Sequence, residues 1–493
     1  MSGSHSHSMS GSHSHSGTPV RGEEGRRGRE ADVPSPLVDA FASRLRGRIV
    51  RPGEADYESA RKLWNGMIDR RPALVARCAG DEDVVAAVDF ARDNEILVAV
   101  RGGGHGVAGQ AVCDGGLVVD LSEMRGVDVD PEWRRAVAQG GCTLGDIDRE
   151  TQRHGLATPL GVVTETGAAG LTLSGGIGWL RRKHGLSCDN LLSVRVATAD
   201  GRLLVADESQ HQDLFWAVRG GGGNFGVVTS FEYRLHPLGP EVFLCFVLYP
   251  ADRTKEVLRA CEHYLSQRPD DFAPIGVLGK VPPVEPFPPE AHGKDFTALL
   301  APYPGDPADG ERLLQPLREI ADPLCDLSGP MPYTEVQAIL DADYPDGLHY
   351  YWKSVNVPEL SDELIERLAE RAAAAPSPQS TIDVWYQGGA MARVGEEETA
   401  FANRNAPYLL GIEANWEAEA DSAENMTWVR GTFADLKSFS AGGVYLNFPG
   451  FLEEGEQILR EGYGMNYERL SAVKAKYDPA NLFHLNANIK PKS

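Results

Sequence analysis

Short apolar runs alternate with amphipathic stretches over the first half of the chain. Runs of strand length and β-branched character stand at residues 73–77, 96–100, 116–121 and 193–198. Residues 81–94 instead repeat their apolar positions with helical spacing. This alternation predicts an α+β lobe that extends from about residue 38 to residue 236.

The sequence changes in character at about residue 237. From there to residue 440 glycines become fewer, prolines cluster, and helix-like stretches such as residues 362–375 alternate with strand-like ones. We expect this region to form a second lobe. Residues 441–493 differ again, with a strand predicted at 443–448 and a helix at 467–477. That helix is expected to end where a proline follows shortly after it.

The start of the chain is set apart from both lobes. Residues 1–17 repeat a Ser-His pattern that is typical of an engineered affinity tag, so they do not enter the fold prediction. Residues 18–37 are charged and contain prolines, and we expect them to form a disordered leader. This start hides any targeting signal, and none is visible.

The composition restricts the classes of partner. The 493 residues include 71 acidic and 48 basic ones, a formal net charge of −23 at pH 7. This acidic balance argues against nucleic acid or a membrane and favours a self-repelling monomer or small homo-oligomer. The seven cysteines are scattered without CxxC spacing, which is typical of buried thiols in a reducing compartment. We therefore expect a cytoplasmic protein without a metal site.

A glycine loop with a histidine carries the strongest chemical signal. The apolar run at residues 96–100 leads directly into Arg101-Gly102-Gly103-Gly104-His105. Glycines after a strand let backbone N–H groups approach a bulky anion, because no Cβ stands in the way. The neighbouring imidazole is a nucleophile and a candidate point of covalent attachment. The alternative is a glycine turn with a bystander histidine.

Two further glycine-rich stretches follow, at residues 167–178 and 219–226. Residues 221–226 satisfy the spacing GxGxxG, which in a dinucleotide-binding fold follows a strand and opens a helix. Here the preceding residues 213–218 have helical character and the following residues 227–233 have strand character. Because this order is reversed, we reject the dinucleotide-fold interpretation.

Taken in order, these segments resemble a known family. They are the loop at 101–105, residues 166–178, 184–191 and 213–226, and the ending Tyr-Asp-Pro-Ala-Asn-Leu-Phe at 477–483. The set is similar to the berberine-bridge-enzyme-like FAD-linked oxidases of the vanillyl-alcohol oxidase superfamily, near the bacterial oxidases of natural-product pathways.

The resemblance implies a two-lobe α+β flavoprotein. The FAD lobe would consist of two α+β subdomains at residues 38–236, completed by the C-terminal segment 441–493. The substrate lobe, residues 237–440, would place an antiparallel sheet covered by helices over the flavin ring.

The resemblance also implies how FAD is held. The histidine of the loop is bonded to the flavin in this family, which assigns the covalent link to His105. The other residues implied in FAD binding are Arg101, Gly102, Gly103, Gly104, Gly106, Gly109, Gln110, Gly161, Val163, Thr166, Gly167, Gly170, Gly175, Gly176, Gly178, Asn190, Val227, Tyr445, Asn447, Asn486 and Asn488.

Two positions of that set bear on the flavin chemistry. Many relatives add a second bond from a cysteine, and Val163 stands at that position here, so the resemblance implies a single covalent attachment. The nearest cysteine, Cys188, is expected to be a packed thiol. Thr166 stands at the family's oxygen gate and has nearly the shape of valine, which favours an oxidase. Thr166 alternatively hydrogen-bonds the flavin.

The catalytic base matches the family in part. A glutamate that some members use is replaced by Arg393, which cannot act as a base. Others use a Tyr-x-Asn-Tyr segment, of which Tyr445 is kept and the second tyrosine is Phe448. Tyr445 is the first candidate for the base and Asp383 the second. The alternative for Asp383 is a solvated carboxylate on a strand, and Glu165 is a third acid near the flavin.

A substrate pocket is expected beside these groups. Period-two alternation over residues 381–387 puts Asp383, Trp385 and Gln387 on one face of a strand, and Tyr351 is expected on another wall. The implied reaction is hydride transfer from an alcohol-type carbon of an organic metabolite to FAD, which O2 reoxidises to give H2O2. Two alternatives stay open: an oxidative cyclase or C–C bond-forming enzyme, and a flavin-binding protein without turnover.

Overall fold

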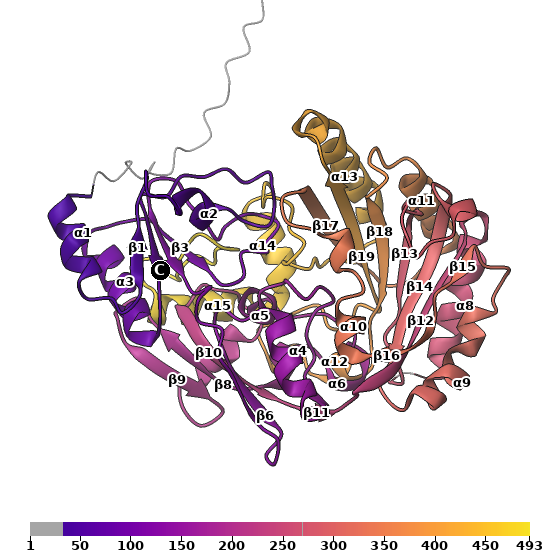
Figure 1. Ribbon diagram of the computed structural model, residues 1–493, viewed down its shortest axis with the longest axis horizontal. Helices are drawn as coiled ribbons and strands as arrows, with labels where there is room; N and C mark the ends of the chain where they lie inside the picture. Colours follow the sequence, from indigo (N-terminus) through magenta and orange to yellow (C-terminus); the bar gives the residue numbers. More distant parts are fainter. Residues whose placement is uncertain (1–32, 269) are drawn as a thin grey trace, which may run out of the picture.

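Two lobes lie side by side in the molecule. The computed structural model describes residues 33–268 and 270–493. One lobe contains the N-terminal half of the chain together with the yellow C-terminal segment, and the other contains the middle of the chain (Figure 1). Among these residues no helix is long and apolar enough to cross a membrane.

The first helix begins inside the segment predicted to be a disordered leader. Helix α1 spans Ser35–Ala42, and Pro36 stands in its first turn, where the missing N–H costs little. Phe41 is buried and stacks on Phe90 with ring centroids 4.2 Å apart. The prediction of disorder is therefore wrong for residues 35–37, because this contact anchors the helix. Residues 1–32, with the tag-like repeat, lie outside the described residues.

The first lobe contains two main sheets. The smaller has the strand order β1-β2-β4-β3, and its last three strands are parallel. These strands are Arg48–Val50, Leu74–Arg77, Leu117–Asp120 and Val98–Arg101. The larger is antiparallel, with the order β5-β6-β10-β8-β9. Its strands are Val127–Asp130, Arg135–Gln139, Val227–Arg234, Leu191–Ala197 and Leu203–Asp207. The short strands β7 (Leu156–Ala157) and β11 (His236–Pro237) pair beside them.

The helices of this lobe cover the sheets and carry the glycine segments. They are α2 (Tyr57–Arg61), α3 (Asp81–Asp93), α4 (Leu144–Gln152), α5 (Ala168–Leu173), α6 (Arg181–His184), η1 (Cys188–Asn190) and α7 (Gln212–Val218). The chain runs from helix α7 through glycines into strand β10, so the helix-then-strand order inferred for residues 213–233 is confirmed.

The second lobe is built on one antiparallel sheet of eight strands. Its order is β15-β12-β14-β13-β18-β19-β17, with β16 also paired to β12. The bounds are β12 Glu241–Pro250, β13 Ile275–Lys280, β14 Asp295–Tyr303, β15 Cys325–Asp326, β16 Gly329–Pro332, β17 His349–Val357, β18 Thr381–Tyr386 and β19 Tyr408–Trp416.

Helices cover the outer face of this sheet and leave its inner face toward the first lobe (Figure 1). The covering helices are α8 (Thr254–Ser266), α9 (Pro307–Arg318), α11 (Asp362–Ala373) and α13 (Ser422–Lys437). The shorter ones are η2 (Ala251–Arg253), η3 (Pro289–Ala291), α10 (Tyr333–Gln337), η4 (Asp341–Asp343), α12 (Ala390–Arg393) and η5 (Glu419–Asp421).

The C-terminal segment returns to the first lobe. It contains α14 (Glu456–Tyr463), η6 (Gly464–Asn466) and α15 (Tyr467–Tyr477). The buried Lys474 ammonium joins the two parts, because it donates to the Asn224 and Phe483 carbonyls and to the Asp478 carboxylate. The strand predicted at residues 443–448 is wrong: this run forms coil and a turn, since its polar groups bond to Ile177 and Leu171 of the first lobe and to the Ser354 hydroxyl of strand β17, and not to a sheet ladder.

Candidate active site

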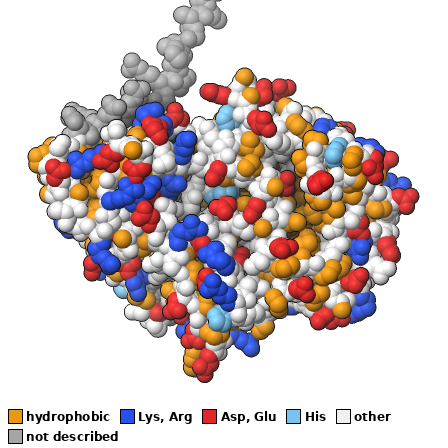
Figure 2. All heavy atoms as spheres, viewed as in Figure 1, with side chains coloured by type: hydrophobic (Ala, Val, Ile, Leu, Met, Phe, Trp, Pro, Cys, Tyr) orange, Lys and Arg blue, Asp and Glu red, His pale blue; other side chains and the backbone are white. Residues whose placement is uncertain are grey.

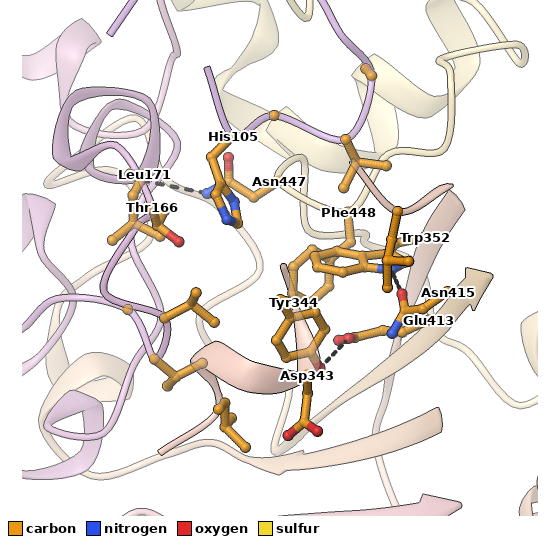
Figure 3. A pocket seen from close by; sticks show the side chains of 18 of the residues that line it. His105, Thr166, Leu171, Asp343, Tyr344, Trp352, Glu413, Asn415, Asn447 and Phe448 are labelled. Carbon is orange, nitrogen blue, oxygen red and sulfur yellow. Dashed lines mark hydrogen bonds between the residues drawn. The ribbon is translucent and has the colours of Figure 1, made fainter. Parts of the chain in front are cut away.

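A cavity of about 1260 Å³ lies where the lobes meet. Typical ligand pockets are roughly 300–1,000 Å³, so this one has room for a large cofactor and a second molecule. One wall comes from the glycine segments of the first lobe and the other from the inner face of the eight-stranded sheet. Figure 3 shows the two walls facing each other, with His105 and Thr166 on one side and Tyr344 and Glu413 on the other.

The glycine wall depends on two chains that touch backbone to backbone. A Cβ added to Gly103 would lie 2.5 Å from the Cα of Gly167, so any side chain there would separate the two loops. At Gly106 and Gly170 an added Cβ would meet nothing within 4 Å, because both positions open into the cavity. This backbone packs against a second loop on one side and carries no side chain on the side of the cavity. Such a cradle is suited to a phosphate-bearing ligand.

Several residues implied in FAD binding do not line this wall. Gly175 makes room for the Phe401 ring, Gly176 for Ser187, and Gly178 for the Leu160 carbonyl. Asn190 is buried and donates its amide to the His184 and Leu186 carbonyls at 2.9 Å each. Arg101 donates to the Ala60 carbonyl at 2.7 Å. These residues are absent from the cavity lining and pack against neighbouring loops, so their binding of the cofactor stays a prediction.

The remaining residues implied in FAD binding divide into those that line the cavity and those that do not. Those that line the cavity are Gly102, Gly103, Gly104, His105, Gly106, Gly109, Gln110, Gly161, Val163, Thr166, Gly167, Gly170, Val227, Tyr445, Asn447 and Asn486. Asn488 does not line it, and its binding of the cofactor stays a prediction. Gly222, Gly223 and Gly226 line the cavity although sequence reasoning did not assign them, because their GxGxxG spacing was weighed for one fold alone.

His105 is held by a stack of aromatic rings that crosses between the lobes. Its imidazole lies 4.0 Å from the Trp64 ring centroid, and Trp64 lies 3.6 Å from Tyr350 of strand β17. The Asn65 amide ties the stack down by donating to the Val107 and Tyr350 carbonyls. Loss of hydration lowers the pKa of His105 to about 4, so the ring is neutral at pH 7. Its Nε2 is buried without a hydrogen-bond partner among the described residues.

Tyr445 lies in the cavity wall with its hydroxyl oxygen between two donors. The Ile177 backbone N–H donates to it at 3.2 Å and the Asn447 amide at 2.8 Å. Burial raises the pKa of Tyr445 to about 12, while both donors act in the opposite direction because they favour the phenolate. Asn447 also reaches the Leu171 carbonyl at 3.5 Å, which connects this turn to the glycine wall (Figure 3).

Two buried carboxyl groups lie together on the sheet wall. Asp383 pairs with Gly411 across strands β18 and β19, and Glu413 is two residues further on the same face. A Cβ on Gly411 would lie 3.3 Å from Glu413 Oε1 and 3.5 Å from Asp383 Cβ, so the missing side chain leaves room for the pair. Burial raises the pKa of both, that of Asp383 to about 7, and the neighbouring Asp383 carboxylate raises that of Glu413 further.

Glu413 was missed by sequence reasoning. The Tyr344 hydroxyl donates to its Oε2 at 2.7 Å (Figure 3). The available signal was an acid within the apolar strand at residues 408–416, which is expensive to bury unless it serves a site.

The strand register corrects two substrate-pocket predictions. Trp385 lines the cavity, but Gln387 lies beyond the end of strand β18, where its backbone carbonyl accepts from Arg182. On strand β17 the neighbouring residue Trp352 lines the cavity, whereas Tyr351 faces the helix side and donates to Glu453. Neither Gln387 nor Tyr351 lines the cavity, because strand β18 ends at Tyr386 before Gln387 is reached and strand alternation turns Tyr351 to the face opposite Trp352.

The acidic surface, the cysteines and the possible metal ligands were compared with the position of the cavity. Acidic side chains, red in Figure 2, lie on both lobes and near the line where the lobes meet. Cys188 is fully buried, and no cysteine of the described residues lines the cavity. Within residues 33–268 and 270–493, no group of three or more His, Cys, Asp or Glu is arranged to hold a metal ion.

The fold and the cavity define a class of cofactor-dependent oxidoreductase, and comparisons with known proteins agree. Residues 72–207 match the FAD binding domain family, and residues 444–490 match the family of berberine and berberine-like proteins. An FAD-linked oxidoreductase of Dictyostelium discoideum is 31% identical over 458 residues, 92% of this chain and 97% of that protein. The chain therefore belongs to the berberine-bridge-enzyme-like FAD-linked oxidoreductases.

Two other relatives fit the same assignment. Glucooligosaccharide oxidase of Sarocladium strictum is 29% identical and covers 87% of this chain and 89% of its own. The crystal structure of 6-hydroxy-D-nicotine oxidase from Arthrobacter nicotinovorans has a TM-score of 0.81 at 29% identity, and covers 91% of this chain and 98% of its own. The predicted family, two-lobe fold and FAD-linked oxidoreductase activity are confirmed.

Proposed function

We propose that this protein oxidises an alcohol-type carbon of a small organic metabolite, with FAD bonded to His105 and O2 as the final acceptor. One observation carries the proposal: the glycine cradle with His105 and the proton-accepting candidates Tyr445 and Asp383 line a single cavity. When bound, FAD supplies two-electron chemistry, since it takes hydride from the substrate carbon and passes the electrons to O2, giving H2O2.

The state of His105 supports its role as the attachment point. A pKa near 4 keeps the imidazole neutral and nucleophilic at physiological pH, and its unpartnered Nε2 lies at the cavity wall. The Trp64 stack fixes the plane of the ring. A single bond is proposed because Val163 occupies the position of the second attachment and the described lining contains no cysteine.

Tyr445 is proposed to take the substrate O–H proton. To act as a base Tyr445 must first lose its own O–H proton to solvent, and the two N–H groups that donate to its oxygen stabilise the resulting phenolate, which then accepts the substrate proton and returns to the phenol. Asp383 is the second candidate, with a pKa near neutrality that suits proton exchange. Thr166, beside His105 in the cavity wall, is small enough to leave an approach for O2 (Figure 3).

Peptide mass mapping of the denatured holoenzyme tests the attachment. We expect the flavin mass on the peptide that contains His105 and on no other peptide. His105→Ala should release all of its flavin on denaturation, and the control His484→Ala, in the exposed C-terminal tail, should keep the bond. Free FAD from the wild-type protein, or a second flavinylated peptide, would contradict the proposal.

A stoichiometry measurement tests the reaction. With an alcohol that bleaches the flavin band, we expect one H2O2 for each carbonyl group formed, the carbonyl being trapped with a hydrazine reagent. A product without a new carbonyl would favour the oxidative cyclase. A panel of sugars and phenolic alcohols that leaves the flavin band unchanged would instead favour a flavin-binding protein without turnover.

A further inference from the structure

The sheet wall of the cavity carries several acidic side chains and almost no basic ones. The acidic residues that line the cavity are Asp343, Asp383, Glu413, Glu417, Asp421 and Glu424. Lys280 is the single Lys or Arg in the described lining, and it is already paired with Asp295. Among the described residues, none of these six acids forms a salt bridge.

Two polar atoms inside this wall lack partners and point to a ligand. Asp383 is 5% exposed, and its Oδ1 has no hydrogen-bond partner among the described residues. Trp385, two residues along the same strand face, is 4% exposed, and its indole Nε1 is also without one. Buried polar groups are normally bonded, so a carboxyl oxygen left open at a cavity wall is suited to a ligand that brings the donor.

Aromatic rings stand beside the acids. Tyr344 and Phe448 each meet Trp352 edge to face, with centroids 5.3 Å apart in both pairs. The Trp352 indole donates to the Asn415 amide oxygen at 2.7 Å, which fixes the ring (Figure 3). Aromatic rings next to a carboxylate attract organic cations through both the ring quadrupole and the opposite charge.

We propose that this end of the cavity binds a positively charged substrate, an organic ammonium ion, with the Asp383–Glu413 pair as its counter-ion. This inference rests on the proposed function, since it takes the cavity as the substrate site, and it adds the class of substrate. The net charge of −23 would also draw cations toward the molecule.

The charge of the pair decides which variants are informative. The titratable groups that face it are Asp343 and the Tyr344 hydroxyl, and its other neighbours, Thr381 and Asn415, are neutral. Two adjacent buried carboxyls share one proton near neutral pH, which leaves one negative charge. Replacing one acid by its amide leaves that charge on the other, whereas replacing both removes it.

Equilibrium binding to the oxidised holoenzyme tests the proposal without requiring turnover. The probes are choline and its neutral isostere 3,3-dimethylbutan-1-ol, followed by perturbation of the flavin spectrum and by calorimetry at low ionic strength. We expect choline to bind at least about tenfold more tightly. Equal affinities would overturn the inference, while failure to form carbonyl and H2O2 from any alcohol would overturn the proposed function and leave this result standing.

Substitutions of the two acids test whether they supply the negative charge that binds choline. The double variant Asp383→Asn/Glu413→Gln should lower the choline preference to about twofold or less, and Glu413→Gln alone should keep most of it at pH 7. Asp322→Asn, an exposed acid of the same lobe outside the cavity, is the control and should change nothing. A folded double variant that keeps a tenfold preference would overturn the assignment.

A pH series covers the case in which the double variant does not fold. Choline is permanently charged, so only the protein titrates. The wild-type preference should rise between pH 6 and pH 9 as the second carboxyl ionises, and it should rise less in Glu413→Gln. A flat wild-type profile would overturn the role of the pair.

Discussion

The two walls of the cavity differ in which part of the chain they present to a ligand. The glycine wall presents backbone, and its shape comes from close approaches such as that of Gly103 to Gly167. The sheet wall presents side chains, and its chemistry comes from residues far apart in sequence, such as Tyr344, Asp383 and Glu413, which the strand register brings together. The first wall fits a cofactor, and the second presents the side chains that a substrate would meet.

The two walls also differ in which buried polar groups are energetically unfavourable. On the glycine wall the described polar groups are mostly backbone, and the buried side-chain atoms without a partner include His105 Nε2 and Asn486 Oδ1. On the sheet wall two acids are buried together against their electrostatic preference. Such an arrangement is destabilising unless a ligand or a reaction uses it.

The largest effect is expected on the glycine wall. Gly103→Ala puts a methyl group 2.5 Å from the Gly167 Cα, and overpacking against backbone costs about 1–3 kcal/mol and opens the cradle. We expect a lower unfolding temperature and little bound FAD, measured by thermal unfolding and by the ratio of flavin to protein absorbance. Gly170→Ala is the control for stability, because nothing lies within 4 Å of its new methyl group. Equal losses of stability in both variants would contradict the backbone-contact argument.

The next effect concerns the junction of the walls. Tyr445→Phe keeps the ring but removes the oxygen between Ile177 and Asn447, so we expect kcat to fall at least about 100-fold with the flavin content unchanged. Stopped-flow measurement of flavin bleaching reads the step directly. Tyr463→Phe, which removes another buried hydroxyl outside the cavity, should leave bleaching close to wild type. A Tyr445→Phe enzyme at near wild-type rate would shift the assignment to Asp383.

The aromatic stack between the lobes should give a smaller change. Trp64→Leu leaves a void between His105 and Tyr350 and removes two stacking contacts, which we expect to cost about 2 kcal/mol of unfolding free energy. Trp133→Leu is the control, since Trp133 is 69% exposed and its loss should change stability by less than about 0.5 kcal/mol. If the two variants unfold alike in denaturant titrations, the stack contributes nothing to joining the lobes.

The smallest effect is a gain in stability on the sheet wall. The folded-state pKa of Asp383 is raised from an ordinary 3.8 to about 7, so the folded protein loses stability as pH rises through that window. Asp383→Asn removes the penalty, and we expect at least about 1 kcal/mol of added stability at pH 8.5 and close to none at pH 4. Unfolding free energies at both pH values check this. The gain should be absent from Asp322→Asn, and an equal gain at both pH values would contradict the linkage.

Much of the first lobe was predictable because its signals are local. A strand that ends in three glycines and a histidine specifies a loop whose function depends on neighbouring residues, and the helix at residues 467–477 has the predicted bounds. Gly175, Gly176 and Gly178 face packed neighbours instead of the cavity, and a glycine is required equally by a ligand and by a packed neighbour. The sequence does not show whether a ligand or a packed neighbour lies against a given glycine.

The second wall was predictable only in part, since side chains reach it through register. Asp383 and Trp385 were found from alternation within one strand, but the same rule was extended to Gln387, which lies beyond the end of that strand at Tyr386. The side chains of the adjacent residues Tyr351 and Trp352 point to opposite faces of strand β17, and the sequence does not say which face meets the cavity. Glu413 needed strand β19 beside β18, and no local pattern pairs those two strands.

By itself, then, the sequence determined the family, the cofactor class and the backbone cradle, because these depend on short segments whose chemistry is local. The tertiary structure decided which glycines open into the cavity, which acids lie side by side and which aromatic rings surround them. Those properties come from the distance between segments hundreds of residues apart, and hydrophobic burial and strand pairing set that distance across the whole chain.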